Sequence, residues 1–176
     1  MIRPLVCAAL LFAAAACERA QNQAEAPSPD APPVAAACND VAVNPAVSVA
    51  PGPSVAAASD EGLLGGPIAP GTYDLVRVEQ RNGAADWTEQ TWRSLRVADS
   101  EAGQTLDFVT ARGSASAAPE RFSARLREEP GALIFTCGRT GEAATSWAVS
   151  RSGLQIELPA ETGAGVTLHI FQRRSN

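Results

Sequence analysis

The chain has 176 residues and a formal net charge of −5, which fits a single acidic domain once its terminal segments are set aside. All fourteen of its basic side chains are arginine, and they form no basic run. This balance argues against nucleic acid and anionic lipid head groups as partners, because both are bound by clustered positive charge.

The start of the chain has the organisation of a secretory signal peptide. Arg3 supplies a positive charge, Leu5–Ala13 is an apolar run, and the small residues Ala14–Ala16 follow. This order is typical of a segment that directs export and is then removed. The apolar run is too short for a transmembrane helix, which needs roughly twenty apolar residues. We therefore expect residues 1–16 to be a signal peptide.

Cys17, which directly follows these small residues, resembles the conserved cysteine of the lipobox in bacterial lipoproteins. The resemblance implies cleavage before Cys17, its lipidation, and attachment to the membrane through the acyl chains. Because Glu18 rather than Asp comes next, it also implies the bacterial cell envelope as location, at the outer membrane facing the periplasm. An ordinary signal cut after Ala16, which would release a soluble secreted protein, remains the alternative.

Residues 17–37 are rich in Ala and Pro and have no apolar periodicity. Such a segment buries too little apolar surface to offset the entropy lost on ordering, and its prolines favour extended conformations. We expect a disordered tether that starts at the lipidated Cys17.

Two cysteines, Cys38 and Cys137, remain after Cys7 leaves with the signal peptide and Cys17 takes lipid. An exported protein meets oxidising conditions, so we expect a disulfide between them. Two free buried thiols are the alternative. A metal site is not expected, because the chain has one histidine and no Cys-x-x-Cys pair.

Residues 38–64 are interrupted by prolines and predict an irregular segment that the disulfide would staple to the domain. Within it, Val41–Val43 predicts a short edge strand.

From residue 65 to residue 174 the pattern is all-β, with turn residues between short strands. Asn82-Gly83 and Ser152-Gly153 predict tight turns, and the change of apolar face between Leu75 and Val76 indicates a β-bulge or burial on both faces. Loops are expected at Gly113–Ala118 and Gly138–Ala144. The expected strands are Thr72–Val78, Trp87–Val97, Thr105–Thr110, Arg121–Arg127, Leu133–Cys137, Ser146–Arg151, Leu154–Leu158 and Val166–Ile170.

Alternation along these strands predicts which side chains point inward. The inward sets include Phe122, Ala124 and Leu126, then Leu154, Ile156 and Leu158, then Val166, Leu168 and Ile170. Alternation then turns His169, the only histidine, outward to solvent. About eight antiparallel strands in a meander avoid exposed edges by closing into a barrel, and a two-sheet sandwich is the alternative.

This part of the chain resembles the lipocalin-like group of small bacterial lipoprotein barrels. The resemblance rests on Gly71–Leu75 at the start of the first strand and on Trp147, Gly153–Ile156 and Phe171–Arg173 near the end. The Gly-x-Trp motif of true lipocalins is missing, and Leu64–Gly66 stands in its expected place. A small lipocalin-like barrel is the fold that the resemblance implies.

Aromatic side chains are the candidate ligand-lining residues. They are Tyr73, Trp92, Phe108, Phe122, Phe135 and Trp147. The alternative is that they fill the barrel, since eight strands leave an interior just wide enough for side chains. The outward Arg121, Arg125 and Arg127 indicate a solvated face or a site for an anionic partner.

No pattern in the chain predicts catalysis. A single histidine between apolar residues leaves no base for a nucleophile, and Glu128-Glu129 lie at a Pro-Gly turn. The glycine-rich Gly62–Gly66 lacks the lysine and helix of a phosphate loop. We expect no enzyme, no catalytic residue, no cofactor and no metal.

The sequence therefore predicts a non-enzymatic, membrane-anchored envelope lipoprotein that binds a small apolar ligand or supports envelope upkeep. A protein-binding module, such as a hydrolase inhibitor or an assembly accessory, is the alternative, with an envelope protein as its partner. Both need the same scaffold.

Overall fold

The computed structural model describes residues 37–50, 54–55, 62–85, 87–160 and 165–175. The predicted signal peptide, Cys17 and nearly all of the predicted tether lie outside these residues. The described residues form ten β-strands and no helix, which confirms the all-β prediction, and none forms a helix able to span a membrane. The strands are β1 (Ser54–Val55), β2 (Gly71–Arg81), β3 (Thr91–Ser100), β4 (Gly103–Arg112), β5 (Glu120–Arg127), β6 (Ala132–Cys137), β7 (Glu142–Ala144), β8 (Ser146–Val149), β9 (Gly153–Pro159) and β10 (Val166–Arg173).

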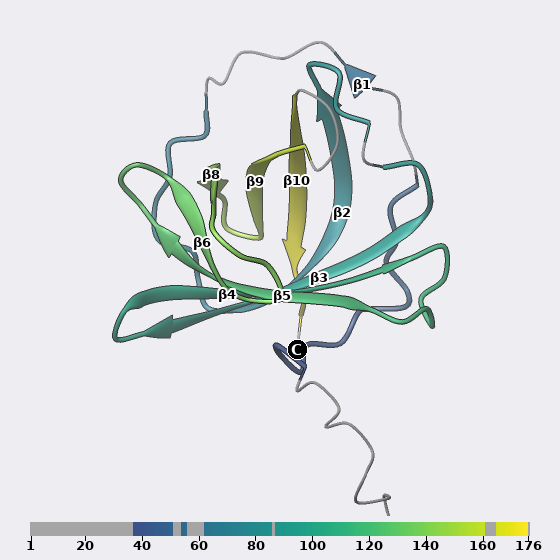
Figure 1. Ribbon diagram of the computed structural model, residues 1–176, viewed down its shortest axis with the longest axis horizontal. Helices are drawn as coiled ribbons and strands as arrows, with labels where there is room; N and C mark the ends of the chain where they lie inside the picture. Colours follow the sequence, from purple (N-terminus) through teal and green to yellow (C-terminus); the bar gives the residue numbers. More distant parts are fainter. Residues whose placement is uncertain (1–36, 51–53, 56–61, 86, 161–164, 176) are drawn as a thin grey trace, which may run out of the picture. The chain divides into compact units, whose positions relative to one another are not determined.

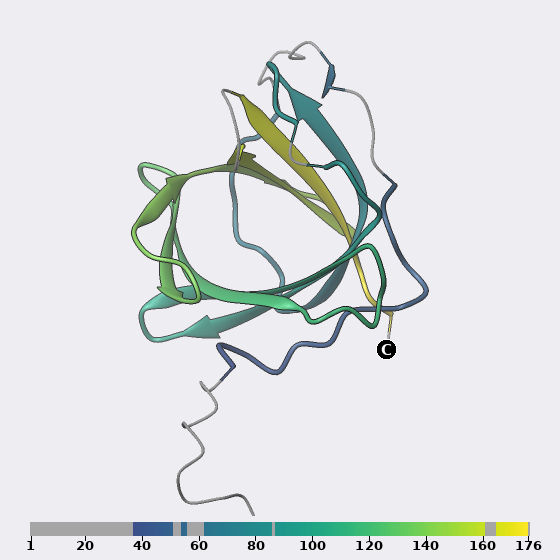
Figure 2. The same cartoon turned by 45° about the vertical axis from the view of Figure 1, so that its right-hand side comes forward.

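Nine of these strands, β2 to β10, form an antiparallel and nearly closed barrel (Figure 1). Consecutive strands pair from β2 to β7 and from β8 to β10, and β10 returns to pair with β2. Seen from a second direction, the strands wrap around a common interior (Figure 2). The predicted meander closed as a barrel is confirmed, in place of the two-sheet sandwich. The short β1 pairs in parallel with the end of β2.

The two ends of the sheet are joined by the segment that contains β7 and β8, because these two consecutive strands pair with different neighbours. Thr145 alone separates β7 from β8; β7 pairs with β6, whereas β8 pairs with β9. The Thr145 amide donates to the Gly131 carbonyl at 3.0 Å, and its hydroxyl donates to the Glu157 carbonyl at 2.7 Å. The predicted loop Gly138–Ala144 thus contains a strand, because β7 takes up Glu142–Ala144 to bridge the two sides of the barrel.

The predicted turn at Asn82-Gly83 is confirmed, with φ of 55° and 86° for the two residues. The next strand starts at Thr91 rather than at Trp87. Trp87 instead lies in the connecting loop, where it is buried and its amide donates to the Gln80 side chain at 3.0 Å. This loop therefore carries an aromatic ring to one end of the barrel.

The predicted irregularity in β2 is a β-bulge. The pairing between β10 and β2 shifts by one residue between Ile170 and Phe171, which pair with Arg77 and Leu75 and leave Val76 over. Leu75 is buried whereas Val76 is 40% exposed. The bulge lets Leu75 on one side and Val78 on the other both pack against the core.

The inward face of β10 differs from the predicted one. Leu154 and Ile156 are buried as expected, and they pair with Phe171 and His169. Residues directly opposite in an antiparallel pair share a face of the sheet. Thr167, His169 and Phe171 therefore point inward, and the predictions that Val166, Leu168 and Ile170 form the inward face and that His169 is solvated are wrong. Leu168 is nevertheless buried, at 4% exposed, on the opposite face of the strand.

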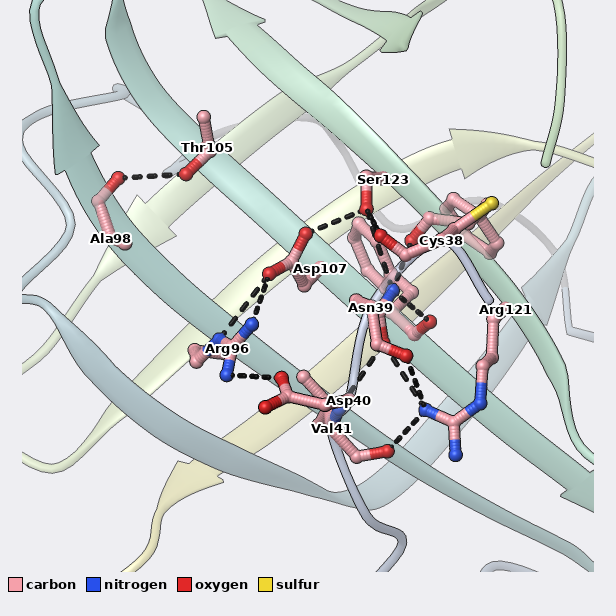
Figure 3. A network of polar contacts seen from close by, with 12 residues as sticks. Cys38, Asn39, Asp40, Val41, Arg96, Ala98, Thr105, Asp107, Arg121 and Ser123 are labelled. Carbon is pink, nitrogen blue, oxygen red and sulfur yellow. Dashed lines mark hydrogen bonds and ion pairs between the residues drawn. The ribbon is translucent and has the colours of Figure 1, made fainter. Parts of the chain in front are cut away.

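The segment Cys38–Ala50, called the strap from here on, crosses the outer face of β3, β4 and β5 (Figure 3). The predicted disulfide Cys38–Cys137 is present, with 5.5 Å between the Cα atoms. Asn39 donates from its side-chain amide to the carbonyls of Phe108 and Phe122, at 3.2 Å each. The strap is therefore fixed covalently and by side-chain contacts.

The predicted edge strand at Val41–Val43 is not formed. The Val41 carbonyl accepts a hydrogen bond from the Arg121 side chain, and the strap makes its ladder-like pairing only at Val49, opposite Thr91. Hydrogen bonds from side chains thus satisfy backbone groups of the strap that a neighbouring strand would otherwise have bonded.

Candidate functional site

A cavity of about 200 Å³ lies at the end of the barrel that Trp87 partly covers. Inward side chains of β3, β5, β6, β7, β9 and β10 meet there with residues of the loops after β2, β6 and β9. Its lining residues are Trp87, Arg93, Phe122, Phe135, Arg139, Ala143, Leu158, Pro159, Ala160, Thr167 and His169. Most of this lining is apolar, but two arginines and a histidine share it.

Arg93 is the deepest charged group of the cavity. It lies on the same face of β3 as the core residues Leu95 and Val97, so strand alternation carries it inside, where it is only 4% exposed. Its Nε donates to the Thr110 hydroxyl at 2.8 Å, and its Nη1 lies 3.1 Å from Nε2 of His169. These contacts fix the position of the guanidinium.

The contact with Arg93 determines the protonation of His169. A guanidinium nitrogen can only donate, so Nε2 of His169 accepts and the ring proton resides on Nδ1. Burial lowers the pKa of His169 well below its usual value, and the charges of Arg93, Arg112 and Arg139 add to this, against a weaker opposing effect of the Ile156 backbone. His169 is therefore a neutral, buried side chain.

Aromatic rings and arginines alternate around the cavity. The guanidinium carbons of Arg93 and Arg112 lie 5.1 Å and 5.7 Å from the ring centre of Trp87. Arg139 lies 4.2 Å from the ring centre of Phe122. Cation–π contact of this kind favours a positive charge next to an otherwise apolar surface.

Glu120 is the acidic partner of Arg139, which lines the cavity. Its carboxylate accepts a hydrogen bond from Arg139 at 2.6 Å. Burial alone would raise the pKa of Glu120, but the bond from Arg139 and the charges of Arg139, Arg93 and Arg112 outweigh it and lower the pKa. Glu120 and Arg139 thus form an ion pair.

The predicted ligand-lining residues fall into three groups. Phe122 and Phe135 line the cavity, and Phe108 stacks on Phe122 with 4.5 Å between ring centres. Tyr73 and Trp147 belong to the buried core, where they donate to the carbonyls of Ala69 and Gly66.

Trp92 is the exception, because it lies on the outer face of the barrel. Strand alternation turns Arg93 inward and Trp92 outward, and the Trp92 indole donates to the Pro45 carbonyl of the strap at 3.1 Å. The outer face also holds Arg121, which contacts Asn39 of the strap, and Arg127, which pairs with Glu142.

Sequence reasoning missed Arg93, His169, Arg139 and Glu120. Arg93 could have been predicted from the sequence. It lies two residues before Leu95 and four before Val97, and alternation along the strand therefore places it on the same face as these apolar residues. His169 faces the interior because of how β10 pairs with β9, and Arg139 reaches the cavity because of the conformation of the loop after β6. Neither follows from alternation within one strand.

Among the residues that the structure describes, no group of three His, Cys, Asp or Glu side chains could hold a metal ion. The polar contact of His169 at Nε2 is with a guanidinium, not with a hydroxyl or thiol. The arrangement can therefore bind through apolar contact and positive charge.

No family model matches the chain, and neither the curated proteins nor the solved structures include a match.

Proposed function

We propose that the chain is a non-enzymatic envelope lipoprotein, anchored through acyl chains on Cys17, whose barrel binds a small and mainly apolar ligand. The observation that carries the binding function is the cavity of about 200 Å³ with walls from Phe122, Phe135 and Leu158. Pockets for drug-sized ligands measure about 300–1,000 Å³. The ligand is therefore smaller than these.

The distribution of core residues supports a binding role for this end of the barrel. The core beside the cavity is filled: Ile68, Leu106 and Leu133 are each at most 1% exposed, and none of them lines the cavity. Tightly packed interiors contain few voids larger than a water molecule. A cavity of this size next to a filled core is what a binding barrel requires.

The anchor is tested by the intact mass of protein purified from membranes. We expect a chain that starts at Cys17 and carries a diacyl or triacyl increment, and a Cys17→Ser variant that lacks it. An unmodified mass, with the protein in the soluble fraction, would contradict the anchor and leave the binding function to be judged separately.

The binding function is tested by filling the cavity. Ala143 lines it, and the next residue of the strand, Ala144, is exposed. We expect native mass spectrometry to show a co-purifying small molecule in the wild type and in Ala144→Phe, but not in Ala143→Phe. If no variant or wild-type sample retains a ligand, the cavity is not a binding site, and the protein-binding alternative takes its place.

A further inference from the structure

A second, open pocket lies at the other end of strands β9 and β10 from the cavity. The cavity is lined by the end of β9 and the start of β10, whereas this pocket is lined by the turn before β9, the end of β10 and the start of β2. Its volume is about 390 Å³, and its polar lining consists of Thr72, Arg151, Ser152, Arg173, Arg174 and Ser175. Among the described residues that line it, none is acidic.

Backbone hydrogen bonds hold the segments of this pocket together. The Arg173 amide donates to the Ser152 carbonyl, and the Arg174 amide donates to the Thr72 carbonyl, at 2.8 Å each. The turn that carries Arg151 is thus tied to the end of β10, and the end of β10 is tied to the start of β2. The guanidinium groups therefore belong to a fixed backbone framework.

Arg174 has a structural role in this framework. Its side chain donates to both carboxylate oxygens of Asp74, at 3.0 Å and 2.5 Å, and Asp74 is only 5% exposed. The same side chain reaches the Ala42 carbonyl of the strap at 3.5 Å. The charge of Arg174 is thus balanced by a buried carboxylate, and Arg174 forms part of the wall rather than a contact for an anion.

Arg151 and Arg173 supply the positive charge of the pocket. In the part of the chain that the structure describes, neither of them forms an ion pair with a carboxylate. Arg173 donates from Nη2 to the Pro70 carbonyl at 2.6 Å, which uses one of its five N–H groups. A Cβ at Gly71 would lie 3.0 Å from Nε of Arg173, so the glycine lets this guanidinium lie close to the backbone.

The chemistry of these side chains fits a phosphate group. Guanidinium N–H groups bind phosphate oxygens in pairs, and hydroxyl groups can donate to the same oxygens. A phosphomonoester has three terminal oxygens that point in different directions, so it can accept from Arg151, Arg173 and a serine hydroxyl on separate segments. The two oxygens of a carboxylate lie in one plane and match fewer of these donors.

On these grounds we propose that the pocket binds a phosphomonoester group through Arg151 and Arg173. The group belongs either to a small soluble molecule or to a lipid head group, since both present the same oxygens. This site is independent of the proposed binding function, because the pocket and the cavity share no lining residue. The sequence has no basic run at this site, because Arg151 and Arg173 are brought to one pocket only by the fold.

Isothermal titration calorimetry with glycerol 3-phosphate and glycerate tests the inference, because the second compound carries a carboxylate in place of the phosphate. The Cys17→Ser protein is used, since it cannot be acylated at that position. We expect glycerol 3-phosphate to bind at least about fivefold more tightly than glycerate, as more charge-assisted hydrogen bonds form.

Arg151→Gln and Arg173→Gln should each weaken the binding of glycerol 3-phosphate about five- to tenfold, because each removes charge-assisted hydrogen bonds. Arg77→Gln is the matched control. It removes the same charge from a β2 side chain that is 67% exposed and does not line the pocket, and it should leave the affinity unchanged.

The source of the phosphate is distinguished by co-sedimentation of the Cys17→Ser protein with phosphatidylcholine vesicles that contain or lack phosphatidic acid. Retention only by phosphatidic acid, lost in Arg151→Gln, would support the site and assign a lipid head group. Binding of glycerol 3-phosphate without retention would support it and assign a soluble molecule.

Three results would overturn the phosphate site. The first is binding of neither glycerol 3-phosphate nor phosphatidic acid vesicles. The second is glycerate binding as tightly as glycerol 3-phosphate, which would indicate a general anion site. The third is an equal effect of Arg77→Gln and Arg151→Gln, which would show that overall charge and not this pocket determines the affinity. None of these results bears on the cavity at the other end of β9 and β10.

Discussion

His169 illustrates how a single side chain can couple stability to pH. In the folded protein it is 4% exposed and its pKa lies well below the usual value, because burial and nearby arginines disfavour the charged ring. In the unfolded chain the pKa is about 6.5. Below that pH the unfolded state binds a proton that the folded state does not.

Stability should therefore be complete above about pH 6.5 and fall as the pH decreases below it, by up to about 1.4 kcal/mol per pH unit. Urea unfolding at several pH values between 7.5 and 5 measures this slope. His169→Gln should flatten it, because the chain has no other histidine. An equal slope in both proteins would show that another group is responsible.

Alanine variants of two glycines in the turn between β6 and β7 distinguish the cost of a strained backbone from the cost of steric overlap. Gly138 and Gly141 have φ of 78° and 81°, but a Cβ at Gly138 would lie 2.2 Å from the Arg121 carbonyl oxygen, whereas one at Gly141 has open space. Both alanine variants should lose about 1–2 kcal/mol for the left-handed conformation. Gly138→Ala should lose at least about 1 kcal/mol more by overpacking, as measured by urea unfolding; equal losses would mean that the backbone relaxes freely.

At the scale of elements, the strap depends on side chains rather than on strand pairing. Asn39→Ala removes the donor to the Phe108 and Phe122 carbonyls and should cost about 1–3 kcal/mol of unfolding free energy. Ser48→Ala is the control, because the hydrogen bond that Ser48 accepts from Gln90 is exposed to solvent, and its loss should change stability by less than about 0.5 kcal/mol. Similar values in both variants would mean that the strap is held by the disulfide alone.

Elements with a strong local signal were predictable from the sequence. Alternation placed β5 and β9, Asn82-Gly83 marked a turn, and the change of face at Val76 indicated the bulge. The three-residue β7 was not predictable, because Glu142–Ala144 has no alternation and no β-branched residue. Its pairing comes from the β6 edge that it meets.

At the scale of the whole molecule, strand count and the edge argument were enough to predict a barrel. The candidate site was not predictable, because it depends on register between strands that are distant in sequence. Arg93 and His169 meet across 76 residues, and only the pairing of β10 with β9 and β2 brings His169 inside. Phe122 and Phe135 were found because apolar alternation is a property of a single strand.

The disulfide should contribute more to stability than any single contact. It joins residues 99 positions apart, and a loop of about 100 residues corresponds to roughly 4–5 kcal/mol of lost chain entropy in the unfolded state. The Cys38→Ser, Cys137→Ser double variant should lose about this much in urea unfolding, and the wild type measured with reductant should match it. A loss of under about 1 kcal/mol would mean that the reduced, unfolded chain already retains structure that brings residues 38 and 137 together.

The same disulfide sets the path of mechanical load. A pull on the chain from its N-terminal side passes across the sulfur bridge from Cys38 to Cys137, and from there into the last part of the barrel. Residues 39–136 lie inside the covalent loop, so stretching the oxidised protein from end to end cannot extend them. A protein tethered through its N-terminus would thus receive tension at the β6 end, two residues from Arg139 at the cavity rim, while most of its strands carry no covalent load.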